Sequence, residues 1–266
     1  MSSQDMRQVK LQMGLSTSHA SRSEETSNSG WSTSMSSPSS PKPFTFEYYR
    51  HLLRTALDNG YKVSSFEKYD AANERTLIMR HDIDYTLNGV SQLALIESDL
   101  GVTATYFFRV HAHEYNCFTP HVYRLIHALR GMGHEIGLHF EAMTIGRALE
   151  MPPVELLRKE KAVLEAITGL EIHSASEHRD ISQVVHQTGN YHDSFDPLDG
   201  GFRNYALEKR FFGGMKYLSD SNGFWREGDP TEHFNKHSRF QVLVHPDWWF
   251  EKDLLLKGPY FHGLGN

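Results

Sequence analysis

The sequence predicts an α/β fold in which parallel strands alternate with helices, arranged as a barrel or a doubly wound sheet. Short apolar runs with strand character alternate with amphipathic segments of helical period, which is the pattern of consecutive βα units. Several of these runs also end in acidic or histidine side chains, and the active sites of parallel βα folds lie at the carboxyl ends of the strands. The chain has 266 residues, 39% of them hydrophobic, which is enough for one substantial domain with a core.

The first 43 residues differ from the rest in composition. Serine dominates them, together with Thr, Asn and Gln, and they lack the spaced apolar residues that close a core. We expect a disordered Ser-rich tail over residues 1–43 and one folded domain over residues 44–266. The stretch VKLQMGL is too short and mixed for a secretory signal. Asp5, Glu24 and Glu25 argue mildly against an organelle transit peptide.

The folded domain is expected to begin with a helix. Phe46, Tyr49, Leu53 and Leu57 lie on one stripe at helical spacing, and Asn59-Gly60 is a stop signal. The elements predicted after it are the strand LIMRHDID (77–84), the helix VSQLALIESDLG (90–101), the strand TATYFFRV (103–110), the helix HVYRLIHALRGMG (121–133), the strand HEIGLHF (134–140), the helix PVELLRKEKAVLEAITG (153–169), the strand EIHSASEH (171–178), a loop-rich stretch from about 180 to 210, and the strands in MKYLSDS (215–221) and FQVLVH (240–245).

Charge and cysteine content narrow the possible functions. The net charge of -6 comes without a Lys/Arg block, which argues against nucleic acid or an anionic membrane surface as the main partner, and no apolar run is long enough to span a membrane. The single cysteine, Cys117, cannot form an intrachain disulfide, so we expect a cytoplasmic location. The 17 histidines are unusual, because histidine both binds metals and titrates near neutral pH.

The first strand ends in RHDID, where Asp82 and Asp84 are two residues apart. Side chains alternate along a strand, so both carboxylates are expected on the same side. Two carboxylates this close repel each other unless a cation or a donor lies between them, and a bound metal would satisfy both. An Asx-turn or a helix N-cap is the competing interpretation of an isolated Asp-x-Asp.

Two further strands end in side chains that bind metals. In HEIGLHFE, the residues Glu135, Gly137, His139 and Glu141 share one face, and His139 lies at the strand end, whereas His134 begins the strand and is expected to be structural. The next strand ends in His178.

The last strand ends in LVHPDWW, which places His245 before two tryptophans. An imidazole opposite a metal-bound carboxylate pair suits acyl-group hydrolysis, since one group takes a proton from water and another protonates the leaving group. Trp248 and Trp249 are candidates for an aromatic platform under a sugar ring.

Taken in order, these motifs resemble the polysaccharide deacetylases, also described as carbohydrate esterase family four. The resemblance runs from Phe44 to about Trp249, and more narrowly the chain is similar to a divergent subgroup associated with surface-polysaccharide gene clusters. The matching segments are RHDID (80–84), Ala94 and Glu97 leading to GVTATYFF (101–108), GHEIGLHFE (133–141), YLSDSNGFWR (217–226) and LVHPDWW (243–249).

The resemblance implies a distorted (β/α)7 barrel over residues 44–266 that binds a divalent cation, usually zinc, at the strand ends. It implies that Asp82 is the catalytic base, that Asp84 and His139 bind the metal, and that His245 is the general acid. Asp220 falls in the segment where an acid orients that histidine. We group Asp220 with Arg109 and Trp248 as candidate substrate-binding residues.

The sequence departs from the family pattern in two places. Met143 stands where the family has its second metal-binding histidine, so either Glu141 or His178 must complete the metal site, or metal binding is weak or lost. The family's Arg-x-Pro motif is not recognisable, which leaves Arg80, Arg109 and Arg179 as alternative partners of the base.

The expected activity is hydrolysis of N- or O-acetyl groups on a sugar or polysaccharide, with a carbohydrate as the substrate. Nitrogen and oxygen ligands favour zinc but also accept iron, cobalt, nickel or manganese. One alternative is a metal-dependent hydrolase of amide or C–N bonds in a small non-sugar molecule. Another is a non-catalytic carbohydrate-binding barrel, which Met143 favours and the joint presence of Asp82, Asp84, His139 and His245 disfavours.

Overall fold

The structure is a computed structural model that describes residues 44–178 and 195–249. The predicted tail at residues 1–43 lies outside the described residues, as does Arg179. The strands of the described residues are β1 (Lys62–Ser64), β2 (Thr76–Ile83), β3 (Thr105–Phe108), β4 (Glu135–Phe140), β5 (Ser174–Glu177), β6 (Asn204–Tyr205), β7 (Lys216–Ser219) and β8 (Arg239–Val244). The α-helices are α2 (Phe46–Asp58), α3 (Val90–Asp99), α4 (Pro120–Gly131), α5 (Ala142–Ala148) and α6 (Pro153–Thr168), and the 3-10 helices are η1 (Pro197–Gly200), η2 (Ser221–Gly223), η3 (Pro230–His233) and η4 (Pro246–Trp248).

All strands belong to one parallel sheet, with the order β6-β5-β4-β3-β2-β8-β7 and β1 added beside β2. The first long strand, β2, is therefore central, and the last strand, β8, lies next to it. One edge of β2 pairs with β8 over Thr76–His81. The other edge pairs first with β1, beginning at Thr76, and then with β3, beginning at Arg80.

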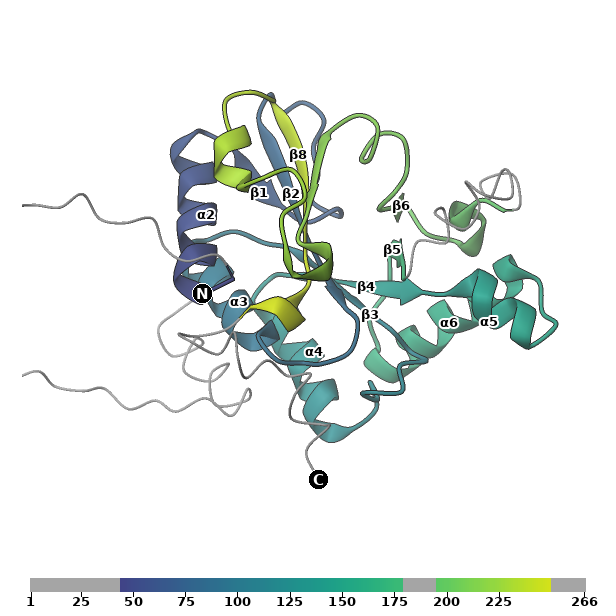
Figure 1. The fold of residues 1–266 in the computed structure, drawn as a ribbon. Helices are drawn as coiled ribbons and strands as arrows, with labels where there is room; N and C mark the ends of the chain where they lie inside the picture. Colours follow the sequence, from purple (N-terminus) through teal and green to yellow (C-terminus); the bar gives the residue numbers. More distant parts are fainter. Residues whose placement is uncertain (1–43, 179–194, 250–266) are drawn as a thin grey trace, which may run out of the picture.

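The sheet curls into a barrel (Figure 1). Arg80 on β2 donates a hydrogen bond to Ser176 on β5, three strands away. In a flat sheet these strands would be roughly 14 Å apart, since neighbouring strands are spaced by about 4.7–4.9 Å. Gln241 on β8 likewise donates to the carbonyl of Ala206, just after β6, at 2.9 Å. No pairing joins β6 to β7 among the described residues, so the barrel is open there. The predicted (β/α) barrel class is confirmed.

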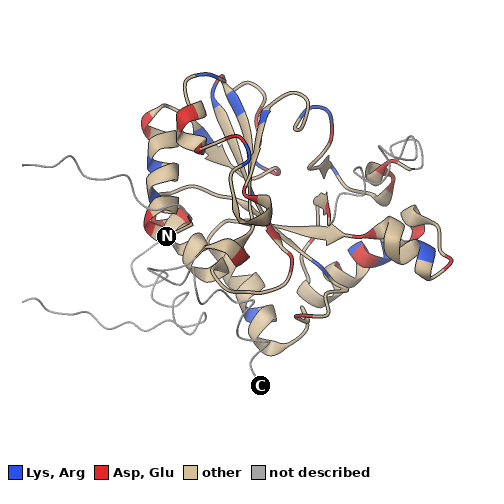
Figure 2. Cartoon of the chain, in the orientation of Figure 1, with Lys and Arg blue, Asp and Glu red and all other residues tan. Residues whose placement is uncertain are grey.

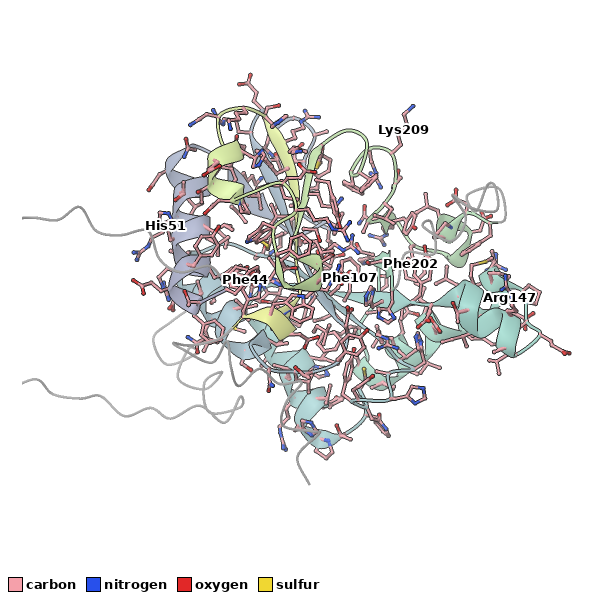
Figure 3. The ribbon with its side chains drawn as sticks, viewed as in Figure 1. Phe44, His51, Phe107, Arg147, Phe202 and Lys209 are labelled. Carbon is pink, nitrogen blue, oxygen red and sulfur yellow. The ribbon has the colours of Figure 1, made fainter. Side chains whose placement is uncertain are left out.

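The two faces of the sheet have different chemistry. Ile136, Leu138 and Phe140 of β4 face outward and belong to the main apolar core beneath the helices. The alternate residues face the barrel interior. At Gly137, an added Cβ would lie 2.4 Å from the ring of Phe107, which is labelled near the middle of the molecule in Figure 3. The interior combines a small apolar cluster with buried polar side chains, and these polar side chains build the candidate site.

The predicted leading helix is present as α2. Thr45 caps it by accepting a hydrogen bond from the amide of Tyr48 at 3.1 Å, and the helix ends before Gly60, whose φ of 79° is left-handed. Its buried side packs against the sheet through Tyr49 and Leu53, as the apolar stripe predicts.

The connections after β5 differ from those before it. Helices α3, α4, α5 and α6 cover the links from β2 to β5, whereas only 3-10 helices occur after β5 in the part of the chain that the structure describes. Strands β1 and β6 and helix α5 were not predicted, because segments this short carry little periodicity. Within the described ranges no helix is both long and apolar enough to cross a membrane. Figure 2 shows Lys and Arg interspersed with Asp and Glu along the ribbon.

Candidate metal centre and active site

Asp82 projects into the barrel near the end of β2 and is held by Arg80. The Arg80 Nε atom lies 2.9 Å from Asp82 Oδ1 and its Nη2 atom lies 2.6 Å from Oδ2, so the contact is bidentate. Asp82 is 2% exposed. Burial acts to raise the pKa of Asp82, but the charges of Arg80 and His139 outweigh it and hold the pKa below its usual range. Arg80 is therefore the partner of this carboxylate, whereas Arg109 is directed elsewhere.

Three side chains at the carboxyl ends of β2, β4 and β5 meet above Asp82. Single ligand atoms of Asp84, His139 and His178 all lie within 4.8 Å of one another, and this is the only such group of three among the described residues. Asp84 Oδ1 lies 3.0 Å from His139 Nε2 and 3.9 Å from His178 Nε2. The order β2-β3-β4-β5 explains the grouping, because parallel strands bring their carboxyl ends to the same edge.

Hydrogen bonds orient both histidines with Nε2 toward Asp84. His139 Nδ1 lies 3.0 Å from the carbonyl oxygen of Ser176, which can only accept, so Nδ1 carries the proton. His178 Nδ1 lies 3.1 Å from Glu141 Oε2. Burial and the nearby His139 lower the pKa of His178 to about 4, so at neutral pH this ring is in the neutral form that binds metals.

These three residues fit a divalent cation. The Nε2 atom of His178 is buried and has no hydrogen-bond partner in the described part of the chain, although it faces a carboxylate. Burial acts to raise the pKa of Asp84, but the hydrogen bond from His139 and the charge of His245 outweigh it. The pKa of Asp84 therefore lies well below its usual value. Two imidazoles and one carboxylate form an accepted ligand set for zinc and similar ions. The group can therefore hold a metal, with His178 as its second histidine.

Glu141, the alternative third ligand, lies outside this group. Its Oε2 atom contacts His178 Nδ1, on the far side of the imidazole from Asp84, and lies 3.6 Å from Arg109 Nη2. Metal-binding histidines commonly present their second nitrogen to a carboxylate in this way.

His245 follows β8 and lies on the opposite side of Asp84. Its Nδ1 atom is 2.6 Å from Asp220 Oδ1, and its Nε2 atom is 3.8 Å from Asp84 Oδ2. Burial acts to lower the pKa of His245, but the charge and hydrogen bond of Asp220 raise it to about 9. His245 is therefore protonated at neutral pH while Asp82 is ionised, and groups whose pKa values are pushed apart in this way can serve as acid and base.

The three residues grouped as substrate-binding have different surroundings. Asp220 is fully buried, accepting from the backbone amide and ring of His245 and from Trp249 Nε1 at 2.8 Å. Arg109 is 4% exposed and donates to the backbone carbonyl of Asp84 at 2.7 Å. These contacts make Asp220 and Arg109 structural supports of the site. Trp248 is half-buried and packs near Gly223, where it can present part of its ring to solvent.

Two supporting residues were not found from the sequence. Ser176 accepts from Arg80 and lies 3.3 Å from Asp82. Asp247 accepts from the Thr86 hydroxyl at 2.7 Å and from the Thr86 amide at 3.0 Å, which ties the loop after Asp84 to the segment after His245. Burial raises the pKa of Asp247 to about 6. Its position two residues after His245 in LVHPDWW was the available signal.

Comparison with known proteins gives structural matches but no sequence matches. No protein-family model matches the chain, and neither does any curated protein. The polysaccharide deacetylase Bc1974 from Bacillus cereus is 13% identical, with a TM-score of 0.42 over 71% of this chain and 89% of its own. The Streptococcus pyogenes deacetylase PplD, in complex with acetate, is 10% identical, with a TM-score of 0.40 over 80% of this chain and 86% of its own. At these scores the function must be inferred from the site itself.

Proposed function

We propose that this protein is a metal-dependent hydrolase that removes N- or O-acetyl groups from a sugar or polysaccharide. One observation carries the proposal: the group of Asp84, His139 and His178 lies between an ionised carboxylate, Asp82, and a protonated imidazole, His245. A metal site flanked by a proton acceptor and a proton donor is what hydrolysis of an acyl group requires.

Asp84, His139 and His178 are the proposed metal ligands, and zinc is the proposed ion. When bound, the cation would supply Lewis-acid chemistry, polarising an acyl carbonyl and acidifying water. The neutral ring of His178 and the Nδ1-protonated ring of His139 both direct an unprotonated Nε2 to this point.

Asp82 is the proposed general base. Arg80 holds its carboxylate in place and keeps it ionised, so it is ready to accept a proton from water at neutral pH. The low pKa makes Asp82 a weak base, and such a base is adequate when the attacking water is acidified.

His245 is the proposed general acid. Asp220 binds Nδ1 and thereby fixes the imidazole so that Nε2–H points toward Asp84. From there it can protonate the amine or alcohol that leaves when the acyl bond breaks, and Asp220 would stabilise the protonated ring beforehand.

The exposure of the site favours a small protruding acyl group. The Asp84 side chain is 16% exposed and that of His245 is 11% exposed, whereas Asp82 lies deeper at 3%. An acetyl group can reach this depth while the rest of the substrate stays outside, near Trp248. The sugar itself is proposed from the motif resemblance and from the ability of a tryptophan face to stack on a sugar ring.

The metal is tested first, by elemental analysis of protein purified without added metal or a polyhistidine tag. We expect about one divalent ion per chain in the wild type, as for a mononuclear site, and its loss in His139→Ala. Absence of metal from the wild type, even after reconstitution with zinc, would show that the barrel is not a metal-dependent enzyme.

The residue roles are tested by acetate release from acetylated oligosaccharides. Asp82→Asn should retain metal and lower kcat by about 10²–10⁴-fold, the usual contribution of a general base. Asp84→Ala should lose the metal itself. Equal metal loss in both variants would contradict the assignment, and activity only on small non-sugar amides would favour the alternative substrate class.

A further inference from the structure

We infer that His111 and Glu160 are positioning residues for the proposed ligand His178, acting on it through Glu141. The inference rests on the proposed metal site. It assigns a role to a partly buried histidine and a buried glutamate that neither contact Asp84 nor occur in any of the motifs that suggested the function.

The four side chains form a continuous chain leading away from the metal site. His178 Nδ1 lies 3.1 Å from Glu141 Oε2, which lies 3.6 Å from His111 Nε2. His111 Nδ1 in turn lies 3.0 Å from Glu160 Oε1. His178 follows β5, Glu141 follows β4 and His111 lies after β3, so the chain links three strand ends to α6.

Glu160 is a charged residue at a buried position where an apolar side chain is expected. It lies on the buried side of α6 with Leu156, Leu157 and Leu164, at positions where an amphipathic helix carries apolar residues. The residue is 4% exposed, and neither carboxylate oxygen makes a hydrogen bond in the described part of the chain. Burying a carboxylate is costly unless it is paired, and among the described residues the ionisable ring that faces it at ion-pair distance is that of His111.

The hydrogen bond between Glu141 and His178 decides which atom of the His178 ring faces the metal site. The rings of His139 and Tyr85 pack edge-on against His178, at centroid distances of 5.1 and 6.1 Å, and such packing does not distinguish nitrogen from carbon. A half-turn of the ring would point a carbon toward Asp84. A hydrogen bond to Nδ1 favours the orientation with Nε2 inward, and His111 Nε2 and Arg109 Nη2 each lie 3.6 Å from the Glu141 Oε2 atom that makes it.

The test compares Glu160→Leu and Glu160→Gln with Glu155→Gln, a control on the same helix whose side chain is 53% exposed. Leucine suits the apolar stripe, so Glu160→Leu should fold with an unchanged or higher Tm in its metal-free form. The readouts are zinc affinity by competition with a chromophoric chelator and the visible spectrum of the Co²⁺-substituted protein. We expect both Glu160 variants to lose about 10–100-fold in affinity, the range found for residues that orient metal ligands, and Glu155→Gln to match the wild type.

A double-variant comparison separates positioning from general loosening of the fold. If Glu160 acts through Glu141, then Glu160→Leu should weaken zinc binding much less when Glu141→Gln is already present. Full additivity, or wild-type affinity and Co²⁺ spectrum in a folded Glu160→Leu protein, overturns the inference while leaving the metal site intact. A wild type that binds no zinc overturns the proposed function and this inference with it.

Discussion

The chemistry of His245 shows how the surroundings of a single residue decide its role. An imidazole buried alone would lose its proton, because burial disfavours the charged form. Here Asp220 reverses the effect, and the pKa rises to about 9. Trp249 donates to the second oxygen of Asp220, so the carboxylate is held from both sides. A protonated His245 thus stabilises the native state below about pH 6.5, and that stabilisation is lost as pH rises through about 9.

Asp220→Asn should move the pKa of His245 back toward or below its ordinary value. Removing the negative charge leaves burial as the dominant influence, and burial favours the neutral ring. The measurement is an NMR titration of the ring protons in metal-free protein. Trp249→Phe serves as a control, because it removes a donor to Asp220 without changing its charge, and it should shift the pKa less. An unchanged titration in Asp220→Asn would rule out Asp220 as the cause.

At the scale of elements, β4 combines two environments in six residues. Its outward side chains fill the core under the helices, while its inward positions carry Glu135, Gly137 and His139. Glu135 accepts from the hydroxyls of Thr105 and Ser174, which satisfies a carboxyl group far below the site. Gly137 makes room for Phe107 between the two polar residues.

Gly137→Ala is expected to destabilise the fold by about 1–3 kcal/mol, the usual cost of overpacking a core. The added Cβ would come within 2.4 Å of the Phe107 ring and 3.1 Å of the Ser174 carbonyl, and neither can move away easily inside the barrel. Urea unfolding of the metal-free protein measures the change.

Gly131→Ala is the matched control for this substitution. Gly131 ends α4, and an added Cβ there meets nothing within 4 Å. We expect no loss of stability, and a gain of up to about 1 kcal/mol from the better helix propensity of alanine. Equal destabilisation by both substitutions would contradict the packing argument.

At the scale of the molecule, a buried carboxylate joins the helices to the outer side of the sheet. Glu97 of α3 has no exposed surface; it accepts from Tyr49 of α2 at 2.5 Å and Tyr106 of β3 at 2.6 Å, and lies 2.7 Å from His81 of β2. Burial acts to raise the pKa of Glu97, but the charge and hydrogen bond of His81 outweigh it. The pKa of Glu97 therefore lies below its usual value. This contact holds β2, which carries Asp82 and Asp84, against two helices.

Glu97→Gln should cost about 1.5–3 kcal/mol at pH 7, the usual contribution of a hydrogen bond to a charged group. Because the folded-state pKa is depressed, this stabilisation is present above the ordinary carboxyl pKa of 4.5 and is lost as pH falls through the folded value. The difference in unfolding free energy between wild type and variant should therefore shrink in acid, as urea titrations at several pH values can measure. A difference that stays constant with pH would mean that the charge of Glu97 is not responsible.

The sequence alone determined the class of fold and the region of the site. Alternating strand and helix patterns predicted parallel βα units, and the longer elements were found at nearly the observed positions. Asp82, Asp84, His139, His178 and His245 were identified because strand ends of such folds meet at one edge, and the structure brings all five together there. These inferences depend on periodicity and on chain order, and both can be read from one sequence.

Only the tertiary structure decided which of the candidate partners touch. The sequence left Glu141 and His178 as equal choices for the third ligand; the pairing of β4 with β5 places His178 in the group and Glu141 behind it. It likewise left several arginines open for Asp82, and Arg80 is chosen because it projects from β2 on the same face two residues earlier. The contact between His111 and Glu160 gave no sequence signal, since the two residues meet only through the packing of α6 against the strand ends. Such choices depend on distances of a few ångströms between segments far apart in the chain, which residue patterns do not encode.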